Sequence, residues 1–297
     1  MTTPLISILV ISYNSSKFII DTLESIKKQS YSKIELIVSD DFSTDNTIKL
    51  VTNWVKQNKS RFINSQIIEA TFNSGIPANC NRGLSHVNGE WIMLLAGDDL
   101  LLPNCITDLA KSKLLFNNDL IISKLIPFND FDNSIDLGLK NKYDKNIDYA
   151  SSLNKQKFKK WMIRFSPFLN APTFFIKTST LKEIGGFNEE FNVIEDSPII
   201  FKILEYGNIS FFSGENILYR ISDTSSTHSK STNRLLQEDL ILLFEKYRKP
   251  LLNRFNIIDF LILKQSYFYA KSIHSKSVFY LFFYKAIRKF IHIFFKF

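Results

Sequence analysis

Apolar runs of strand length alternate with helical patterns in the first third of the chain, and this alternation constrains the fold most. Residues 6–12 form a continuous apolar run, which is followed by apolar side chains at helical spacing, Ile19, Leu23 and Ile26. The same succession recurs in the ranges 34–39, 44–56, 66–70, 77–86 and 91–95. It predicts an α/β fold with a mostly parallel sheet covered by helices on both faces, and ligands of such sheets bind at the carboxyl ends of the strands.

The charge of the chain is unevenly distributed. The net charge is +8, but seven of the 37 Lys and Arg residues and none of the 29 acidic residues lie in 261–297, so the preceding part has a net charge of only +1. A nearly neutral body argues against a nucleic-acid groove across the main domain, and we expect no nucleic-acid partner.

The cysteines and the apolar runs indicate the compartment. Cys80 and Cys105 form no metal-binding or disulfide pattern, which fits a reducing cytoplasm. The apolar run 5–11 is too short for a signal peptide and has no basic residue before it. No window reaches about 18 uninterrupted apolar residues, so we expect no ordinary membrane span.

Two adjacent carboxylates, Asp98 and Asp99, follow the apolar run 91–95. Carboxylates at the end of a strand can hold a divalent cation, and such a cation can hold the diphosphate of a nucleotide. The alternative is a turn that only caps the helix after Pro103.

Polar and aromatic residues also follow the first two predicted strands. Tyr13 could stack on a base, and Asp40 or Asp41 could accept the imino hydrogen of a uracil-like base. A core aromatic and turn-forming carboxylates are the alternatives. Because these residues fall on adjacent strand ends, they favour a nucleotide site.

Small and amide residues frame the third helix. Gly75 permits a tight entry, and Asn81 or Arg82 could reach a phosphate or a neighbouring carboxylate. For Arg82, the more common role is that of a solvated helix residue.

A second acidic pair, Glu195 and Asp196, opens a helix after the Gly185-Gly186 turn. The free amides of a helix N-terminus stabilise such anions, which alone explains many pairs of this kind. The alternative is a general base that removes a proton from an attacking hydroxyl.

Taken in order, these motifs resemble those of family 2 glycosyltransferases with the GT-A fold, over about residues 4–220. The resemblance rests on the segments 7–14, 40–45, 73–75 with 81–83, 96–99, and 185–187 with 195–196. Five motifs in order at familiar separations are more specific than any one of them.

The resemblance implies inverting transfer of a sugar from a nucleotide-diphosphate sugar, with UDP as the expected nucleotide, to a saccharide or lipid-linked saccharide. Asp99, with Asp98 nearby, would hold Mn or Mg at the diphosphate, and Asp196 would be the base, with Glu195 as the near alternative. Tyr13 and Asp41 would contact the base of the nucleotide, Asp40 would support that turn, and Asp98 would approach the ribose or the water shell of the metal. The full nucleotide-binding set would be Ile11, Tyr13, Asp40, Asp41, Arg82 and Asp98.

The chain departs from the family pattern at two positions. Ala96 stands where many members have a further Asp, and Ser222 stands where the family often has a His. His228 lies in the same Ser-rich loop and could reach the diphosphate if the loop closes, although a solvated loop His is the more common role.

The expected domain organisation is a GT-A domain over 1–220 followed by a loop and helical region over 221–297. Within the first domain, 1–103 would be the nucleotide-binding half and 156–220 the half with the acceptor and the base. The intervening segment 127–155 is rich in Asn, Asp and Lys, which is typical of a surface loop or insertion.

The end of the chain, 275–297, has the pattern of a basic amphipathic helix. We expect it to attach the protein peripherally to the inner face of the cell membrane; the alternative is packing on the catalytic domain or on the partner in a homodimer. The expected basic face holds Lys285, Arg288, Lys289, His292 and Lys296, and the expected apolar face holds Phe283, Ile287, Phe290 and Phe294.

The sequence therefore predicts a cytoplasmic, membrane-associated glycosyltransferase that assembles a surface polysaccharide such as lipopolysaccharide or capsule. One alternative is a non-catalytic nucleotide-sugar-binding scaffold with the same fold, but the retained Asp99 and Asp196 argue against it. A nucleotidyltransferase is disfavoured because no Gly-rich, basic phosphate-binding loop follows the first strand.

Overall fold

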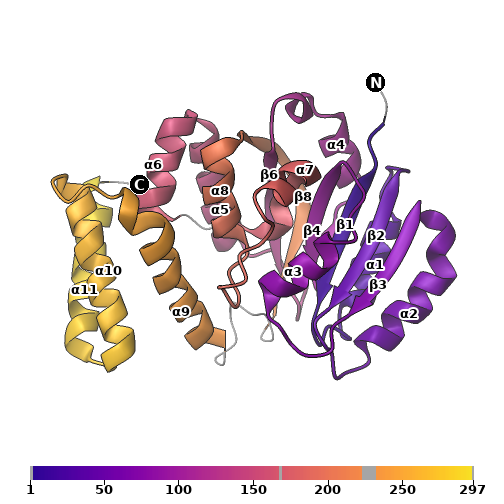
Figure 1. The fold of residues 1–297 in the computed structure, drawn as a ribbon, viewed down its shortest axis with the longest axis horizontal. Helices are drawn as coiled ribbons and strands as arrows, with labels where there is room; N and C mark the ends of the chain where they lie inside the picture. Colours follow the sequence, from indigo (N-terminus) through magenta and orange to yellow (C-terminus); the bar gives the residue numbers. More distant parts are fainter. Residues whose placement is uncertain (1–2, 167–168, 223–231, 296–297) are drawn as a thin grey trace.

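The computed structural model describes residues 3–166, 169–222 and 232–295. Its amino-terminal part alternates strands and helices, as the apolar pattern predicts (Figure 1). The elements are β1 (Ile6–Ser12), α1 (Ile19–Lys27), β2 (Ile34–Asp40), α2 (Thr47–Asn58), β3 (Asn64–Glu69), α3 (Ile76–Leu84) and β4 (Trp91–Ala96).

These four strands are parallel and end at one level. β1 lies between β2 and β4, and the register pairs Ser12 with Asp40 and Ile11 with Ala96. β3 continues the sheet beside β2. The residues that follow β1, β2 and β4 therefore meet at one edge of the sheet, where an α/β sheet binds its ligands.

The remaining strands complete a single eight-stranded sheet. β7 runs antiparallel to both β4 and β6, and β8 runs parallel to β6 and antiparallel to the short β5, giving the order β3-β2-β1-β4-β7-β6-β8-β5. The elements that follow β4 along the chain are β5 (Leu100–Leu101), α4 (Cys105–Lys111), β6 (Leu120–Asn129), α5 (Leu137–Ser151), α6 (Lys155–Phe165), β7 (Phe174–Lys177), α7 (Thr178–Glu183), α8 (Asp196–Tyr206) and β8 (Ile209–Ile221).

Residues 127–155, predicted to be a surface loop or insertion, do not form a loop. β6 extends to Asn129, and α5 occupies most of the segment. Asp136 caps α5 by accepting a hydrogen bond from the Leu139 amide at 2.8 Å. The only residues that α5 buries are Tyr143, Ile147 and Ala150. These three lie on one narrow face, and the polar residues between them hid the helical period.

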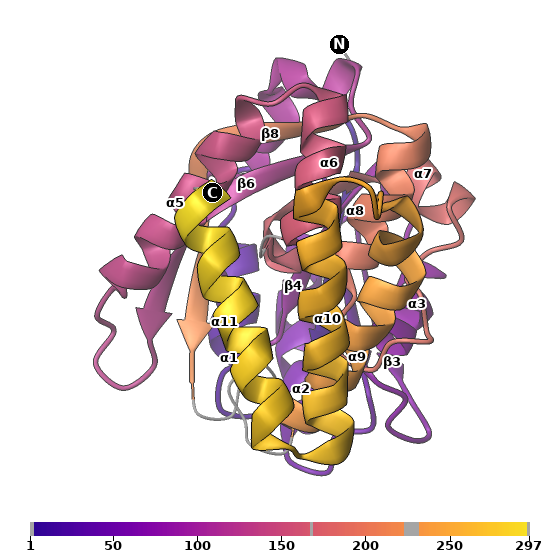
Figure 2. The ribbon, with the colours of Figure 1, turned by 90° about the vertical axis from the view of Figure 1, so that its left-hand side faces the viewer.

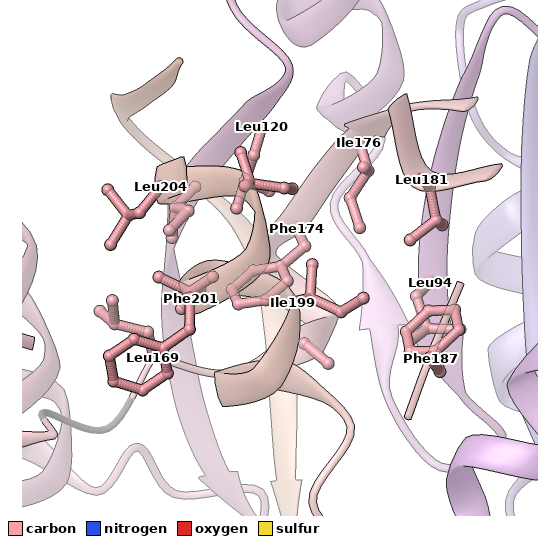
Figure 3. Close-up of a cluster of buried hydrophobic side chains, with 14 of the residues drawn as sticks. Leu94, Leu120, Leu169, Phe174, Ile176, Leu181, Phe187, Ile199, Phe201 and Leu204 are labelled. Carbon is pink, nitrogen blue, oxygen red and sulfur yellow. The ribbon is translucent and has the colours of Figure 1, made fainter. Parts of the chain in front are cut away.

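The core lies on both faces of the sheet, because successive strand residues point to opposite sides. Ile6, Ile8 and Val10 of β1 pack against α1, α2 and α4 on one face. Leu9 belongs to the cluster on the other face, which includes α3 and α8. Figure 3 shows part of that second cluster, in which Phe174 of β7 lies beside Ile199 and Phe201 of α8.

The carboxyl-terminal region is helical. α10 and α11 form an antiparallel hairpin, which lies at the opposite end of the molecule from β3 and α2, with α9 between the hairpin and the sheet (Figures 1 and 2). The rings of Phe268 and Phe283 stack at 5.2 Å within the hairpin. The elements are α9 (Thr232–Leu243), a π-helical turn (Phe244–Arg248), a short 3-10 turn (Lys249–Leu251), α10 (Ile257–Ser275) and α11 (Val278–Phe295).

The helix expected at 275–297 is present as α11, but its expected apolar face is divided. Ile287 packs with Phe244, Ile262 and Ile291 against the rest of the protein. Phe290, expected on the same face, is 44% exposed. The side chains of His292, Phe294 and Lys296 lie outside the described residues. Among the helices that the structure describes, none has the length and the apolar character needed to cross a bilayer.

Candidate active site

Two aromatic rings lie exposed at the carboxyl edge of the sheet. Tyr13 follows β1 and is 50% exposed, so it is no core aromatic. Phe42, two residues beyond the end of β2, is 48% exposed and has a φ of 68°, which belongs to the tight turn after the strand. Sequence reasoning did not single out Phe42, although its place in the Asp40-Asp41-Phe42-Ser43 turn was a usable signal.

Asp40 closes the turn that carries these rings. The carboxylate is buried and accepts hydrogen bonds from the Ser12 hydroxyl at 2.7 Å, the Ser43 amide at 2.8 Å and the Ser43 hydroxyl at 2.6 Å. It thereby ties the end of β1 to the turn after β2.

Asp41 holds the entry to α3. It accepts hydrogen bonds from the amides of Ser74 and Gly75, at 3.0 and 2.8 Å, and from the Ser74 hydroxyl at 2.7 Å. An Arg82 nitrogen lies 3.3 Å from the same carboxylate, and the Arg82 side chain is 23% exposed. Of the roles considered for Arg82, contact with a neighbouring carboxylate is the one found, and the solvated helix residue is not, because the turn after β2 brings Asp41 beside α3.

The side chain of Asn81 is hydrogen-bonded to the protein backbone, so it is not free to bind a phosphate. Its amide nitrogen donates to the Phe187 carbonyl at 2.9 Å, and its oxygen accepts from the Phe187 amide at 2.8 Å. Gly186 has a φ of 68°, and a Cβ there would lie 2.5 Å from the Asn81 side-chain oxygen. This contact fixes the Gly turn that precedes the second acidic pair.

The end of β4 places Asp98 and Asp99 at the same edge as Tyr13 and Asp41. Asp99 is 1% exposed, and its Oδ1 accepts a hydrogen bond from the Arg220 amide of β8 at 2.9 Å. The Asp98 carbonyl accepts from Arg220 Nε at 2.8 Å. Asp99 Oδ2 is buried without a hydrogen-bond partner among the described residues.

Burial disfavours the ionised form of both Asp98 and Asp99. It raises the pKa of Asp99 well above its ordinary value, and the neighbouring Asp98 charge adds to the shift. Burial raises the pKa of Asp98 as well. A cation between the two would reverse this effect, since an opposite charge favours the ionised form.

Arg220 was missed as a site residue because its role depends on distant parts of the chain. Its guanidinium lies 4.4 Å from the ring centre of Phe18 and 4.8 Å from that of Phe128. It also forms an ion pair with Asp130 at 3.2 Å. Arg220 is only 6% exposed, so these contacts hold the backbone that binds Asp99 in place.

The second acidic pair lies where α8 begins. Asp196 accepts a hydrogen bond from the Ser197 amide, so part of its role is that of a carboxylate at a helix N-terminus. Burial raises the pKa of Asp196 to about 6. Burial and the Asp196 charge together raise the pKa of Glu195 to about 8. Near neutral pH, Asp196 is therefore the ionised member of the pair.

One cavity of about 270 Å³ joins the two acidic pairs. Asp98 and Asp99 reach it from the end of β4, Glu195 and Asp196 from the start of α8, and Arg220 from β8. The sequence-based hypothesis requires the two acidic pairs to meet at one site, and both line this cavity. They do so although about 100 residues, the length of a small domain, separate them in the sequence. His228 lies outside the described residues, so its part in this site stays a prediction.

A further carboxylate, Asp239 of α9, anchors the loop before the second pair. It is 1% exposed and accepts hydrogen bonds from three consecutive amides, those of Asn192, Val193 and Ile194, at 2.7 to 3.1 Å. Sequence reasoning missed it; an Asp within the Leu-rich helical run of α9 was the only signal.

Comparison with known proteins identifies the family. A family model described as Glycosyl transferase family 2 matches residues 7–176, which is more than half of the chain. The chain belongs to glycosyl transferase family 2. The family named from the order of the sequence motifs is therefore confirmed.

Relatives in family 2 cover parts of the chain. Putative glycosyltransferase EpsE of Bacillus subtilis is 34% identical over 100 residues, which are 34% of this chain and 35% of EpsE. Glycosyltransferase GlyG of Streptococcus pneumoniae is 32% identical over 130 residues, 43% of this chain and 41% of GlyG. This chain thus spans less than half the length of either relative. A Campylobacter jejuni protein named GalNAc(5)-diNAcBac-PP-undecaprenol beta-1,3-glucosyltransferase is 28% identical over 195 residues, 63% of this chain and 56% of that protein.

Solved structures confirm the GT-A fold. Staphylococcus aureus TarS 1-349 in complex with UDP-GlcNAc has a TM-score of 0.59 at 18% identity and covers 90% of this chain and 81% of its own. The mannosyltransferase PcManGT from Pyrobaculum calidifontis, in complex with GDP-Man and Mn2+, has the same TM-score and identity and covers 99% of this chain and 76% of its own.

The residues at the end of β4 fit the divalent cation that the family implies. Within 3–166, 169–222 and 232–295, no three His, Cys, Asp or Glu side chains are grouped to hold a metal ion. Mg²⁺, however, is commonly held by one or two carboxylates together with substrate phosphates and water. The unpartnered Oδ2 of Asp99, beside Asp98 in the cavity, is the kind of ligand that such a site requires.

Proposed function

We propose that this family 2 chain transfers a sugar from a nucleotide-diphosphate sugar, a UDP-sugar in the first instance, to a hydroxyl of a saccharide or lipid-linked saccharide, with inversion at the anomeric carbon. The observation that carries the proposal is the single cavity that joins Asp98 and Asp99 to Glu195 and Asp196. Donor and acceptor would meet there, the donor on the 1–103 half and the acceptor on the 156–220 half.

On the donor side, Tyr13 would stack on the base and Asp41 would accept its imino hydrogen, with Asp40 supporting the turn. Ile11 lines the shared cavity beside Asp98, which would approach the ribose. Arg82 would act on the nucleotide through Asp41, since the two form an ion pair. The exposed ring of Phe42 offers a second surface for the base.

Asp99, with Asp98, would hold a Mn²⁺ or Mg²⁺ ion, whose chemistry is to neutralise charge on the leaving diphosphate. Asp196 would take the proton from the acceptor hydroxyl as the oxygen attacks the anomeric carbon, while the bond to the diphosphate breaks on the opposite face. A pKa of about 6 leaves Asp196 ionised at neutral pH and still basic enough to share the proton. Glu195, with a pKa of about 8, is mostly protonated there.

The proposed setting is assembly of a surface polysaccharide, such as lipopolysaccharide or capsule, at the cytoplasmic face of the cell membrane. The α10–α11 hairpin supports peripheral attachment. Phe279, Phe282, Phe290 and Ile293 are all more than two-fifths exposed on one side of α11. Such apolar side chains can enter the headgroup region of a bilayer without spanning it.

Separate substitutions of the two acidic pairs test the reaction. Asp196→Asn is expected to abolish transfer but retain UDP-induced thermal stabilisation in the presence of Mn²⁺, whereas Asp99→Asn is expected to weaken both. Asp132→Asn, which removes a carboxylate from an exposed loop, is the matched control. Wild-type protein that binds UDP but turns over no nucleotide sugar in a donor panel would instead indicate a non-catalytic scaffold.

A further inference from the structure

A second and larger cavity lies between the hairpin and the catalytic domain. It has a volume of about 740 Å³ and is bounded by α9 with the π-helical turn, by α10 and α11, and by the end of α6. A pocket of this size is within the range of ligand sites in proteins. Ser166 and Leu240 line both this cavity and the one that holds Asp196, so the two adjoin.

The charged residues of this second cavity are mostly cations. Five basic side chains line it, those of Arg164, Arg248, Lys285, Arg288 and Lys289, against a single carboxylate, that of Glu245. Glu245 is itself paired with Lys249, the first residue of the 3-10 turn that follows.

Only one of the five cations has a carboxylate partner within the part of the chain that the structure describes. Arg164 pairs with Asp259 at 2.7 Å. Arg248 donates instead to two backbone carbonyls at the end of α6, at 2.7 and 2.6 Å, and burial lowers its pKa to about 10. A partly buried guanidinium without a counter-charge favours an anion nearby.

Neutral donors surround these cations. The rings of Tyr269 and Tyr284 lie 5.0 Å apart, and Arg288 donates to the Tyr284 hydroxyl at 3.2 Å. Gln265 and Ser266 of α10 line the same space. Guanidinium, ammonium, hydroxyl and amide donors together suit phosphate oxygens, which accept charge-assisted hydrogen bonds.

The cations of α11 that line this cavity are also exposed to solvent. They are Lys285, Arg288 and Lys289. Lys289 lies seven residues after Phe282, so the basic residues and the exposed rings occupy adjoining faces of α11. A ligand that enters from solvent therefore has access to these cations.

We propose that this cavity binds the phosphate or diphosphate of the acceptor, and that the sugar end of that acceptor reaches Asp196 past Ser166 and Leu240. The inference rests on the proposed function and narrows it to acceptors that carry phosphate. Two sources share this chemistry, a lipid-linked diphosphate saccharide and a saccharide or polyol polymer joined by phosphodiesters.

Binding of two probes to the full chain tests the proposal, measured by calorimetry in EDTA with and without UDP. Farnesyl diphosphate represents the lipid source and a ribitol phosphate oligomer represents the polymer source. Arg288→Gln/Lys289→Gln is expected to lower the affinity for the probe that binds by at least about tenfold, since each lost contact is a charge-assisted hydrogen bond to phosphate. The matched control is Lys264→Gln/Lys271→Gln, which removes the same charge from exposed positions of α10 outside the cavity and is expected to change affinity less than about twofold.

Each outcome decides the question. Tenfold loss in the cavity variant alone supports the proposal, and the probe that binds identifies the source of the phosphate. Equal losses in both variants, displacement of the probe by UDP, or no binding of either probe overturns it. Should the double variant unfold, Lys285→Gln provides the same comparison. UDP-induced stabilisation of the wild type tests the donor site separately, so failure of the proposed function and failure of this inference are distinguishable.

Discussion

Asp239 Oδ2 lies 2.7 Å from the amide nitrogen of Val193. This contact joins α9, in the helical region that follows the sheet, to the loop that leads into Glu195 and Asp196. The same carboxylate also accepts the amides of Asn192 and Ile194. The position of the proposed base thus depends on a helix beyond the sheet as well as on the strands.

Asp239→Asn is expected to lower both stability and turnover. An amide has only one accepting oxygen, and its NH2 group would face backbone amides that also donate. Hydrogen bonds to a buried charged acceptor contribute about 1.5–3 kcal/mol, so the unfolding free energy should fall by about that amount. We expect kcat to fall about tenfold, with KM for the donor little changed, in steady-state kinetics.

Glu238→Gln is the matched control, because the Glu238 side chain is 42% exposed and forms an ion pair with Arg234 of the same helix. A loss in Asp239→Asn that appeared in KM for the donor rather than in kcat would contradict the positioning role.

The pH dependence of turnover should distinguish Asp196 from Glu195 as the base. Since the base must be ionised, kcat/KM is expected to fall about tenfold per pH unit below the Asp196 pKa of about 6. This acid limb should persist in Glu195→Gln, measured from about pH 4 to about pH 9, which is about two units or more on either side of the limb. Loss of all turnover in Glu195→Gln, with a limb near pH 8 in the wild type, would make Glu195 the base.

Glu195→Gln is also expected to stabilise the protein at alkaline pH. The folded-state pKa of Glu195 is raised to about 8 from an ordinary 4.5, so the unfolded chain ionises first and stability falls as pH rises through this window. Glutamine removes that loss. The gain in Tm at pH 8 should exceed the gain at pH 5 by about 2 °C or more. Equal Tm gains at both pH values would show that the Glu195 carboxyl is not held neutral by burial.

Gly75→Ala is expected to destabilise the entry to α3. Gly75 has a φ of 88°, and a Cβ there would lie 3.0 Å from the Asn192 carbonyl oxygen. Strain of this kind costs about 1–3 kcal/mol, measurable by urea unfolding. Gly138→Ala in α5 is the control, because that position has no positive φ and alanine favours helices. If the two variants unfolded at the same urea concentration, the constraint at Gly75 would be absent.

The exposed side of α11 should govern membrane binding. Phe282→Ser/Phe290→Ser is expected to reduce sedimentation with vesicles of phosphatidylglycerol and phosphatidylethanolamine by about tenfold. The reason is that each substitution removes apolar surface that the bilayer would bury. Phe131→Ser, at a 99% exposed loop position, is the control. Unchanged sedimentation, together with a smaller oligomer by light scattering, would assign this side to a homodimer instead.

The sequence by itself determined the strands β1 to β4 and the residues at their ends. Short-range spacing is enough for this, since an apolar run of strand length followed by a helical period needs no distant contact. Tyr13, Asp41 and Asp99 could be placed at one sheet edge because parallel strands bring their carboxyl ends together. The order of the motifs then identified the family.

Only the tertiary structure decided which partners these residues have. Arg82 pairs with Asp41, Arg220 binds Asp99, Asp239 holds the loop before Glu195, and the cations of α11 line a cavity. Each of these contacts joins residues that lie on different elements, and local spacing carries no information about which elements pack together. Helix α5 shows the same limit, because three buried side chains among polar neighbours become a recognisable face only once a sheet is there to cover them.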